Sequence, residues 1–142
     1  MKTLTFLFLV LAVAPVAFAQ STLTVNPSRP IIITGDFTDA SGVKHNGPWC
    51  KVDITVSSDK TVSLSNMSIQ TWNDDGTMSG TWDLGAIEIP AGQPYTFHDF
   101  YIDMFNASPS TVYNVQVEVD GWVGNATNPT GALKLTQTFR TK

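Results

Sequence analysis

The stretch Tyr113-Asn114-Val115-Gln116-Val117-Glu118-Val119-Asp120 alternates apolar and polar side chains with a period of two residues. Successive side chains of a β-strand point to opposite faces of its sheet, so this pattern predicts a strand with one buried and one exposed face. Leu133, Leu135 and Phe139 repeat the alternation near the end of the chain. Both segments are typical of an antiparallel sheet that covers a core on one side only.

The same period predicts most of the remaining chain to be extended. No segment shows a sustained apolar stripe with a helical period, and Thr, Val and Ile are abundant, as in pleated sheets. Turn residues separate eight predicted strands, at 22–26, 31–34, 50–57, 61–73, 77–89, 95–105, 112–120 and 132–141. Seven to nine short strands with turns between them predict an all-β, antiparallel sandwich.

The first residues have the pattern of a secretory signal peptide. A positive end at Lys2 precedes an apolar run, and Ala17-Phe18-Ala19 supplies the small residues of a cleavage site. We expect 1–19 to be the signal peptide and 20–142 to form a single secreted β-sandwich domain, extracellular or periplasmic. No later apolar run is long enough for a membrane segment.

Cysteine content and charge restrict the stabilising forces and the partners. Cys50 is the only cysteine, and it shares a strand phase with Val52 and Ile54, so we expect a buried thiol. A disulfide with another chain stays open as the alternative. The formal charge of −4 becomes −5 once Lys2 leaves with the signal peptide, which makes nucleic acid an improbable partner.

Two tryptophans flank a turn signal in Thr71-Trp72-Asn73-Asp74-Asp75-Gly76-Thr77-Met78-Ser79-Gly80-Thr81-Trp82. A three-residue loop ending in a left-handed Gly76 would place Trp72 opposite Met78 and bring Trp82 to the same face. Both rings would then contribute to the core. A two-residue turn would place the rings on opposite faces instead.

Other breaks have local causes. Ser58-Asp59-Lys60 is predicted to be a tight hairpin turn, and residues 90–94 and 125–131 to be loops. Gly85 lies where the apolar phase slips, which predicts a β-bulge or a bend.

The segment 101–117, which includes Pro109-Ser110-Thr111-Val112-Tyr113 and the Val115-x-Val117 strand, resembles a fibronectin type III domain or a bacterial immunoglobulin-like sandwich. The ending Thr138-Phe139-Arg140-Thr141 is similar to the closing strand of that family. The resemblance implies that the Tyr113 hydroxyl bonds back to the preceding loop. It also implies roles in adhesion, spacing or accessory binding.

Catalytic and metal-binding patterns are weak. The two histidines, His45 and His98, lie in no known motif, and adjacent His98 and Asp99 should point to opposite faces of a strand. The aspartate-rich turns do not match a calcium-binding loop. We therefore expect no enzyme activity, catalytic residue, metal or cofactor.

Exposed aromatic rings are the remaining indication of function. Trp122 follows Asp120-Gly121 at a strand end, and Trp49 shares the polar face of Lys51, so these two rings are the candidate ligand-binding residues. The leading hypothesis is a module that contacts another extracellular or envelope protein in adhesion, structure or assembly. The alternative is a small carbohydrate-binding protein that uses Trp122 and Trp49 on a polysaccharide. A hydrolase with an unfamiliar site is a third.

Overall fold

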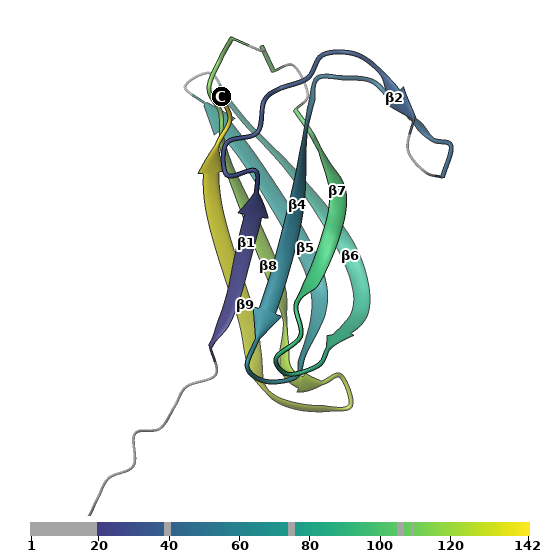
Figure 1. Ribbon diagram of the computed structural model, residues 1–142, viewed down its shortest axis with the longest axis vertical. Helices are drawn as coiled ribbons and strands as arrows, with labels where there is room; N and C mark the ends of the chain where they lie inside the picture. Colours follow the sequence, from purple (N-terminus) through teal and green to yellow (C-terminus); the bar gives the residue numbers. More distant parts are fainter. Residues whose placement is uncertain (1–19, 39–40, 74–75, 105–106, 109) are drawn as a thin grey trace, which may run out of the picture.

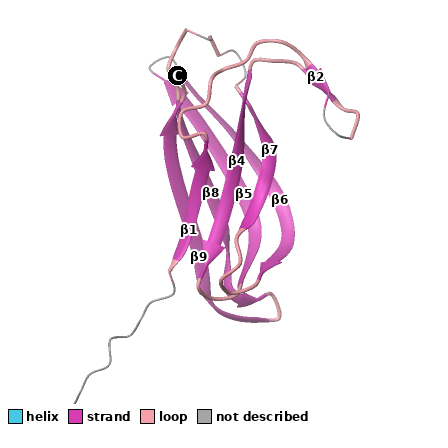
Figure 2. Cartoon of the chain, in the orientation of Figure 1, coloured by secondary structure: helices cyan, strands magenta, loops and turns pink. Residues whose placement is uncertain are grey.

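The computed structural model describes residues 20–38, 41–73, 76–104, 107–108 and 110–142, so the predicted signal peptide lies outside the described residues. Strands and loops make up this part of the chain, and no helix in it is long and apolar enough to cross a membrane (Figure 2). The strands are β1 (Ser21–Asn26), β2 (Phe37–Thr38), β3 (Lys44–His45), β4 (Trp49–Ser58), β5 (Val62–Asn73), β6 (Gly76–Ile89), β7 (Tyr95–Asp103), β8 (Asn114–Asn125) and β9 (Asn128–Arg140).

Two antiparallel sheets face each other (Figure 1). One has three strands in the order β1-β4-β7, and the other has four in the order β6-β5-β8-β9. The short β2–β3 hairpin forms a separate pair that projects at one end. The predicted all-β, antiparallel sandwich is confirmed.

The core fills the space between the inner faces of the two sheets. The odd-numbered valines of the opening stretch, Val115, Val117 and Val119, are buried on β8, and Val52 and Ile54 are buried on β4. Cys50 lies in the same row with an exposed fraction of 0%. The predicted burial of the thiol is confirmed.

The prediction of a tight hairpin turn at Ser58-Asp59-Lys60 is wrong. β4 pairs with β1 and β7, whereas β5 pairs with β6 and β8, so the turn carries the chain from one sheet to the other. Val56 and Val62 are both buried, but they enter the core from opposite sheets. Residues 31–34 form only an isolated bridge, between Ile33 and Trp49, instead of a strand.

The prediction that residues 125–131 form a loop is also wrong. β8 and β9 continue through most of it, and Asn125 pairs with Asn128. The Asn125 side chain accepts hydrogen bonds from the Asn128 backbone and the Thr127 hydroxyl, which closes a tight turn. Side-chain capping by asparagine thus replaces the longer loop.

The β5–β6 hairpin has a register one residue away from the predicted one. Asn73 pairs with Gly76, so Gly76 begins β6, and Trp72 pairs with Thr77 instead of Met78. Trp82 pairs with Met67, five residues from Trp72, so the two tryptophans occupy opposite strand phases. The prediction that both rings lie on one face is therefore wrong; the side chain of Trp82 lies outside the described residues.

The aliphatic residues of β5 decide its buried face. Met67, Ile69 and Thr71 are buried, which leaves Trp72 half-buried on the outer face with Gln70. Burial of the aliphatic side chains of Met67 and Ile69 favours this face over the opposite one, which would bury the Trp72 ring.

Two local predictions are confirmed. The β5–β6 register shifts between Leu64 and Asn66, where Gly85 has a φ of 65°, as expected of a bulge. The Tyr113 hydroxyl accepts a hydrogen bond of 3.1 Å from the backbone N–H of Ser108 in the preceding loop.

Candidate functional site

The segment before the β2–β3 hairpin is attached to the start of β4. Ile33 and Trp49 exchange two backbone hydrogen bonds of 2.8 and 3.0 Å. The indole Nε1–H of Trp49 donates to the carbonyl of Gly35 at 3.0 Å. These bonds bring Phe37 and His45 of the hairpin next to the three-stranded sheet.

Trp49 lies on the outer face of that sheet. In the β4–β7 ladder, Trp49 pairs with Asp103 and Lys51 pairs with Tyr101, while Cys50 faces the core between them. The predicted placement of Trp49 on the face of Lys51 is confirmed. Tyr101 and Asp103 were not among the predicted site residues, because their position beside Trp49 depends on the pairing of two distant strands.

Four rings pack together where the hairpin meets the outer face. Phe37 stacks on Tyr101 with ring centroids 3.9 Å apart and on His45 at 4.7 Å. Trp49 is tilted against Phe37 at 4.7 Å and edge-on to Tyr101 at 5.0 Å. Because Tyr101 and Trp49 belong to β7 and β4, their contacts with Phe37 hold the hairpin against the sheet.

A β-bulge in β7 shapes the neighbouring surface. The β4–β7 register shifts so that both His98 and Asp99 face Asp53. Asp99 has a φ of 52°, a left-handed conformation that aspartate tolerates better than most residues. The Asp99 backbone N–H donates to Asp53 Oδ1 at 2.8 Å, and His98 Nδ1 lies 3.4 Å from Asp53 Oδ2.

The bulge overturns the expected orientation of His98 and Asp99. In a regular strand their side chains would point to opposite faces, but both contact the outer face of β4, His98 at Asp53 and Asp99 at Lys51. The extra residue removes the strict alternation at this point. Sequence periodicity alone contained no signal for it.

Charged groups surround the bulge. Lys51 Nζ lies 2.6 Å from Asp99 Oδ1 and 5.9 Å from the centroid of the Tyr101 ring. The hydrogen bond to Asp99 raises the pKa of Lys51. The backbone N–H of Asp99, helped by His98, lowers the pKa of Asp53.

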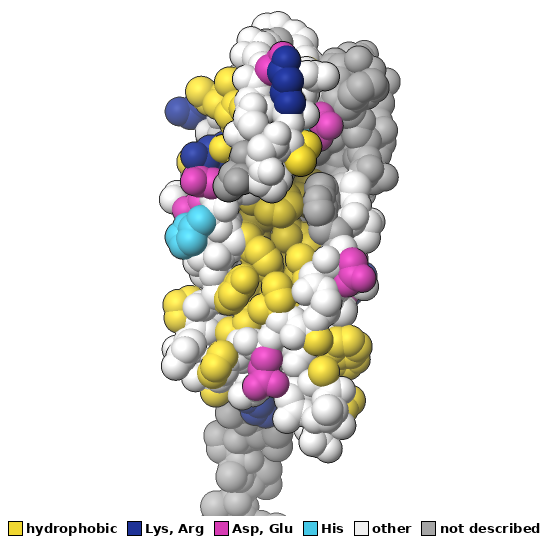
Figure 3. Space-filling view, turned by 90° about the vertical axis from the view of Figure 1, so that its right-hand side faces the viewer, with side chains coloured by type: hydrophobic (Ala, Val, Ile, Leu, Met, Phe, Trp, Pro, Cys, Tyr) yellow, Lys and Arg dark blue, Asp and Glu magenta, His cyan; other side chains and the backbone are white. Residues whose placement is uncertain are grey.

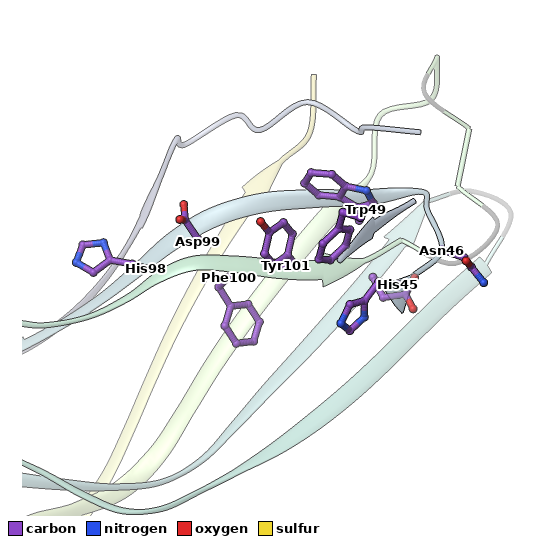
Figure 4. Close-up of a pocket in the computed structure, with 9 residues that line it drawn as sticks. His45, Asn46, Trp49, His98, Asp99, Phe100 and Tyr101 are labelled. Atoms are coloured by element: carbon purple, nitrogen blue, oxygen red, sulfur yellow. The ribbon is translucent and has the colours of Figure 1, made fainter. Parts of the chain in front are cut away.

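His98 and Asp99 of the bulge line a cavity of about 300 Å³ together with the ring cluster, as drawn in Figure 4. Tyr101 and Phe100 are successive residues on β7 that project to opposite sides of the strand, so the cavity reaches around its edge. Within the described residues β7 pairs only with β4, which leaves this edge without a strand partner. The cavity, here called the aromatic pocket, is lined by Phe37, His45, Asn46, Trp49, His98, Asp99, Phe100, Tyr101 and Asp103.

An apolar strip continues from the pocket along the side of the sandwich. Figure 3 shows hydrophobic side chains in a hollow below the hairpin, on the side where β6 and β7 lie in Figure 1. Leu84 and Ile87 of β6 and Phe97 and Phe100 of β7 are only partly buried against the core. These four residues define the apolar strip. On the opposite side of the molecule β1 contacts β9.

Trp122 lies far from Trp49. It is 37% exposed near the end of β8, where Val123 pairs with Val62 at the start of β5. Trp49 begins β4, whose other end leads into β5. The two candidate rings therefore lie at opposite ends of the sandwich and on different sheets, so the structure does not bring them together.

A polar groove of about 390 Å³ crosses the outer face of the four-stranded sheet. Residues of β5, β6 and β8 line it, namely Ser68, Ile69, Gln70, Gly80, Thr81, Gln116 and Glu118. Trp122 occupies the same β8 phase as Gln116 and Glu118, farther along the strand.

No group of three or more His, Cys, Asp or Glu side chains in the described ranges could hold a metal ion. Comparison of the chain with models of protein families, with curated proteins and with solved structures finds no match.

Proposed function

We propose that the chain is a secreted, non-catalytic β-sandwich module that binds another extracellular or envelope protein, in an adhesion, structural or assembly role. The observation that supports it is the apolar strip between β6 and β7, which ends in the aromatic pocket (Figure 3). The side chains of the strip are partly buried, and the apolar surface that they leave open is contiguous, as is typical of protein interaction sites.

The composition of the surface also favours protein contact. Protein interfaces concentrate their binding energy in aromatic residues seated in pockets, with a polar rim around them. The aromatic pocket has this arrangement, with Asp99 and Asp103 beside the rings of Trp49 and Tyr101.

Side-chain packing would contribute more to the contact with the partner protein than hydrogen bonds between a strand of the partner and the sheet edge. Both strands that border the apolar strip have a bulge, at Gly85 in β6 and at Asp99 in β7. Bulges interrupt the ladder and are one way in which proteins prevent uncontrolled pairing at sheet edges.

The strand order supports the proposed immunoglobulin-like relationship. With the β2–β3 hairpin set aside, β1, β4 and β7 correspond to strands A, B and E of that fold, and β5, β8 and β9 to strands C, F and G. The bond from Ser108 to the Tyr113 hydroxyl matches the tyrosine corner of the fold.

Photo-crosslinking in the native host tests the proposal. A benzoylphenylalanine at position 97, in the apolar strip, should give one adduct of defined mass. The same group at position 136, exposed on β9, should not. An additional Ile87→Asp substitution should abolish the adduct while circular dichroism shows an intact fold. Absence of an adduct at 97, or the same adducts from 136, would contradict the proposal.

Polysaccharide binding is a second candidate function, favoured by the polar groove and by exposed Trp122 on the same face. Amide and hydroxyl groups can bond sugar hydroxyls, and an exposed indole can stack on a sugar ring. Affinity electrophoresis against a panel of soluble polysaccharides tests this. Retardation should disappear in Trp122→Ala and persist in Trp49→Ala; unretarded migration of the wild type with all polysaccharides would reject it.

A further inference from the structure

We infer that the aromatic pocket is a site for a basic side chain, arginine or lysine, presented by the partner protein. The inference rests on the proposed protein-binding function and names the chemistry of the group that the pocket would accept. It comes from the combination of aromatic walls with carboxylates at the rim of the same cavity.

A cation of the chain itself already lies beside two residues that line the pocket. The Lys51 ammonium lies 5.9 Å from the centroid of Tyr101 and forms an ion pair of 2.6 Å with Asp99. A cation near an aromatic face is attracted by the negative potential of the ring. Lys51 thus shows, within the molecule, the interaction that a partner's side chain would make.

A second carboxylate extends the acidic rim. Asp103 is exposed, and it pairs with Trp49 in the β4–β7 ladder on the side of Tyr101 that is remote from Asp99. A basic group entering the pocket would therefore meet Asp103 in addition to the rings. A guanidinium suits this place because it is planar, stacks on rings and donates two parallel hydrogen bonds to a carboxylate.

The charges around the pocket are acidic in balance. Asp53, Asp99 and Asp103 lie on the two strands with Lys51, and His45 and His98 add positive charge only when they are protonated. The whole chain has a formal charge of −4. Long-range attraction would consequently favour a basic partner surface.

Ring geometry makes this pocket a poor site for sugar stacking. Sugars stack on broad exposed ring faces, but Phe37 is already stacked on both Tyr101 and His45. Lys51 lies close to Tyr101. The space of about 300 Å³ accommodates the end of one long side chain.

The inference is tested by titrating the isotope-labelled mature protein with N-acetyl-arginine amide at neutral pH. Nuclear magnetic resonance spectra recorded during the titration report the binding. We expect saturable shifts of the Trp49 indole N–H and of the β7 amides around Tyr101, with dissociation constants on the order of millimolar for one side chain. N-acetyl-lysine amide should bind the same site more weakly. Neutral N-acetyl-glutamine amide and methyl glucoside should leave these signals unchanged.

Three variants make the test specific. Lys51→Met keeps the aliphatic stem and removes the competing ammonium, so arginine amide should bind about two- to fivefold more tightly. Asp103→Asn should weaken binding by about the same factor. Asp59→Asn changes the net charge as much as Asp103→Asn does, but Asp59 lies just beyond the far end of β4, so this variant should have no effect.

The inference would be overturned if glutamine amide or methyl glucoside shifted these signals as much as arginine amide does. It would also be overturned if neither Lys51→Met nor Asp103→Asn changed the affinity for arginine amide. The proposed function fails separately, through the crosslink at position 97. A crosslink without arginine binding would mean that the partner docks on the apolar strip with a different group in the pocket. Arginine binding without a crosslink would retain the site and reject the strip as the contact surface.

Discussion

Asp99 connects the backbone of β7 to the chemistry of the aromatic pocket. Its left-handed φ of 52° costs on the order of 1 kcal/mol for a residue with a Cβ. The conformation turns its N–H to the Asp53 carboxylate and its side chain to Lys51. One residue thereby accounts for the bulge and for the placement of two charged groups at the rim.

Tyr113 is expected to stabilise the fold through its hydroxyl. Tyr113→Phe removes the acceptor of the Ser108 N–H and should lower the free energy of unfolding by about 1 kcal/mol. Urea denaturation followed by circular dichroism measures this. Tyr95→Phe, at an exposed ring, is the control and should be neutral; equal midpoints for Tyr113→Phe and wild type would contradict the role of the hydroxyl.

Cys50 should couple stability to alkaline pH. Burial raises the pKa of the thiol from 9.0 to about 12. Below pH 9.0 the thiol is neutral in both states, whereas between 9.0 and about 12 only the unfolded chain ionises. The wild type should therefore lose stability relative to Cys50→Ala across this interval, by up to about 1.4 kcal/mol per pH unit.

Thiol labelling provides the independent check on Cys50. An aromatic disulfide reagent should modify the unfolded chain rapidly and the native protein only as fast as it opens. Equal labelling rates for the two states would show that the thiol is accessible.

At the scale of elements, the close pairing of β5 and β8 depends on glycine. A Cβ on Gly121 would overlap the Ser63 carbonyl oxygen, a backbone atom that cannot rotate away. Gly121→Ala should therefore destabilise the protein by roughly 3 kcal/mol or more. Gly131→Ala, whose Cβ meets nothing within 4 Å, is the matched control; similar thermal midpoints for the two variants would contradict this packing.

The β2–β3 hairpin is expected to detach without loss of the sandwich. Phe37 joins it to Tyr101 and Trp49, so Phe37→Ala should increase the rate of tryptic cleavage after Lys44. Far-ultraviolet circular dichroism of the intact variant should remain that of the wild type. An unchanged cleavage rate, or unfolding of the whole domain, would show that the ring is not the main attachment.

At the scale of the whole molecule, two sheets share one core and should unfold together. Met67 is fully buried on β5, and Met67→Ala should cost about 3 kcal/mol. Circular dichroism and tryptophan fluorescence should shift to the same lower midpoint of denaturation. Val43→Ala, at a side chain that is 54% exposed, is the control; separate transitions for the two probes would show that the sheets are independent.

The sequence by itself determined the strand class, the buried phase of β4 and β8, the burial of Cys50 and the outward position of Trp49. These properties depend on a period of two residues, which is local and holds whichever strand lies alongside. The bulge at Gly85 was predictable from a slip in the same local period. The bond to the Tyr113 hydroxyl was implied instead by the resemblance to fibronectin type III domains.

Only the tertiary structure decided which strands pair, in which register, and where the ladder is interrupted. The Trp72 face, the inter-sheet turn at 58–60 and the bulge at Asp99 each depend on residues distant in sequence. The aromatic pocket follows from them, because Phe37 meets Tyr101 only when the hairpin lies against the β4–β7 ladder. Contacts of this kind arise from the packing of the whole chain, and alternation along one strand contains no information about them.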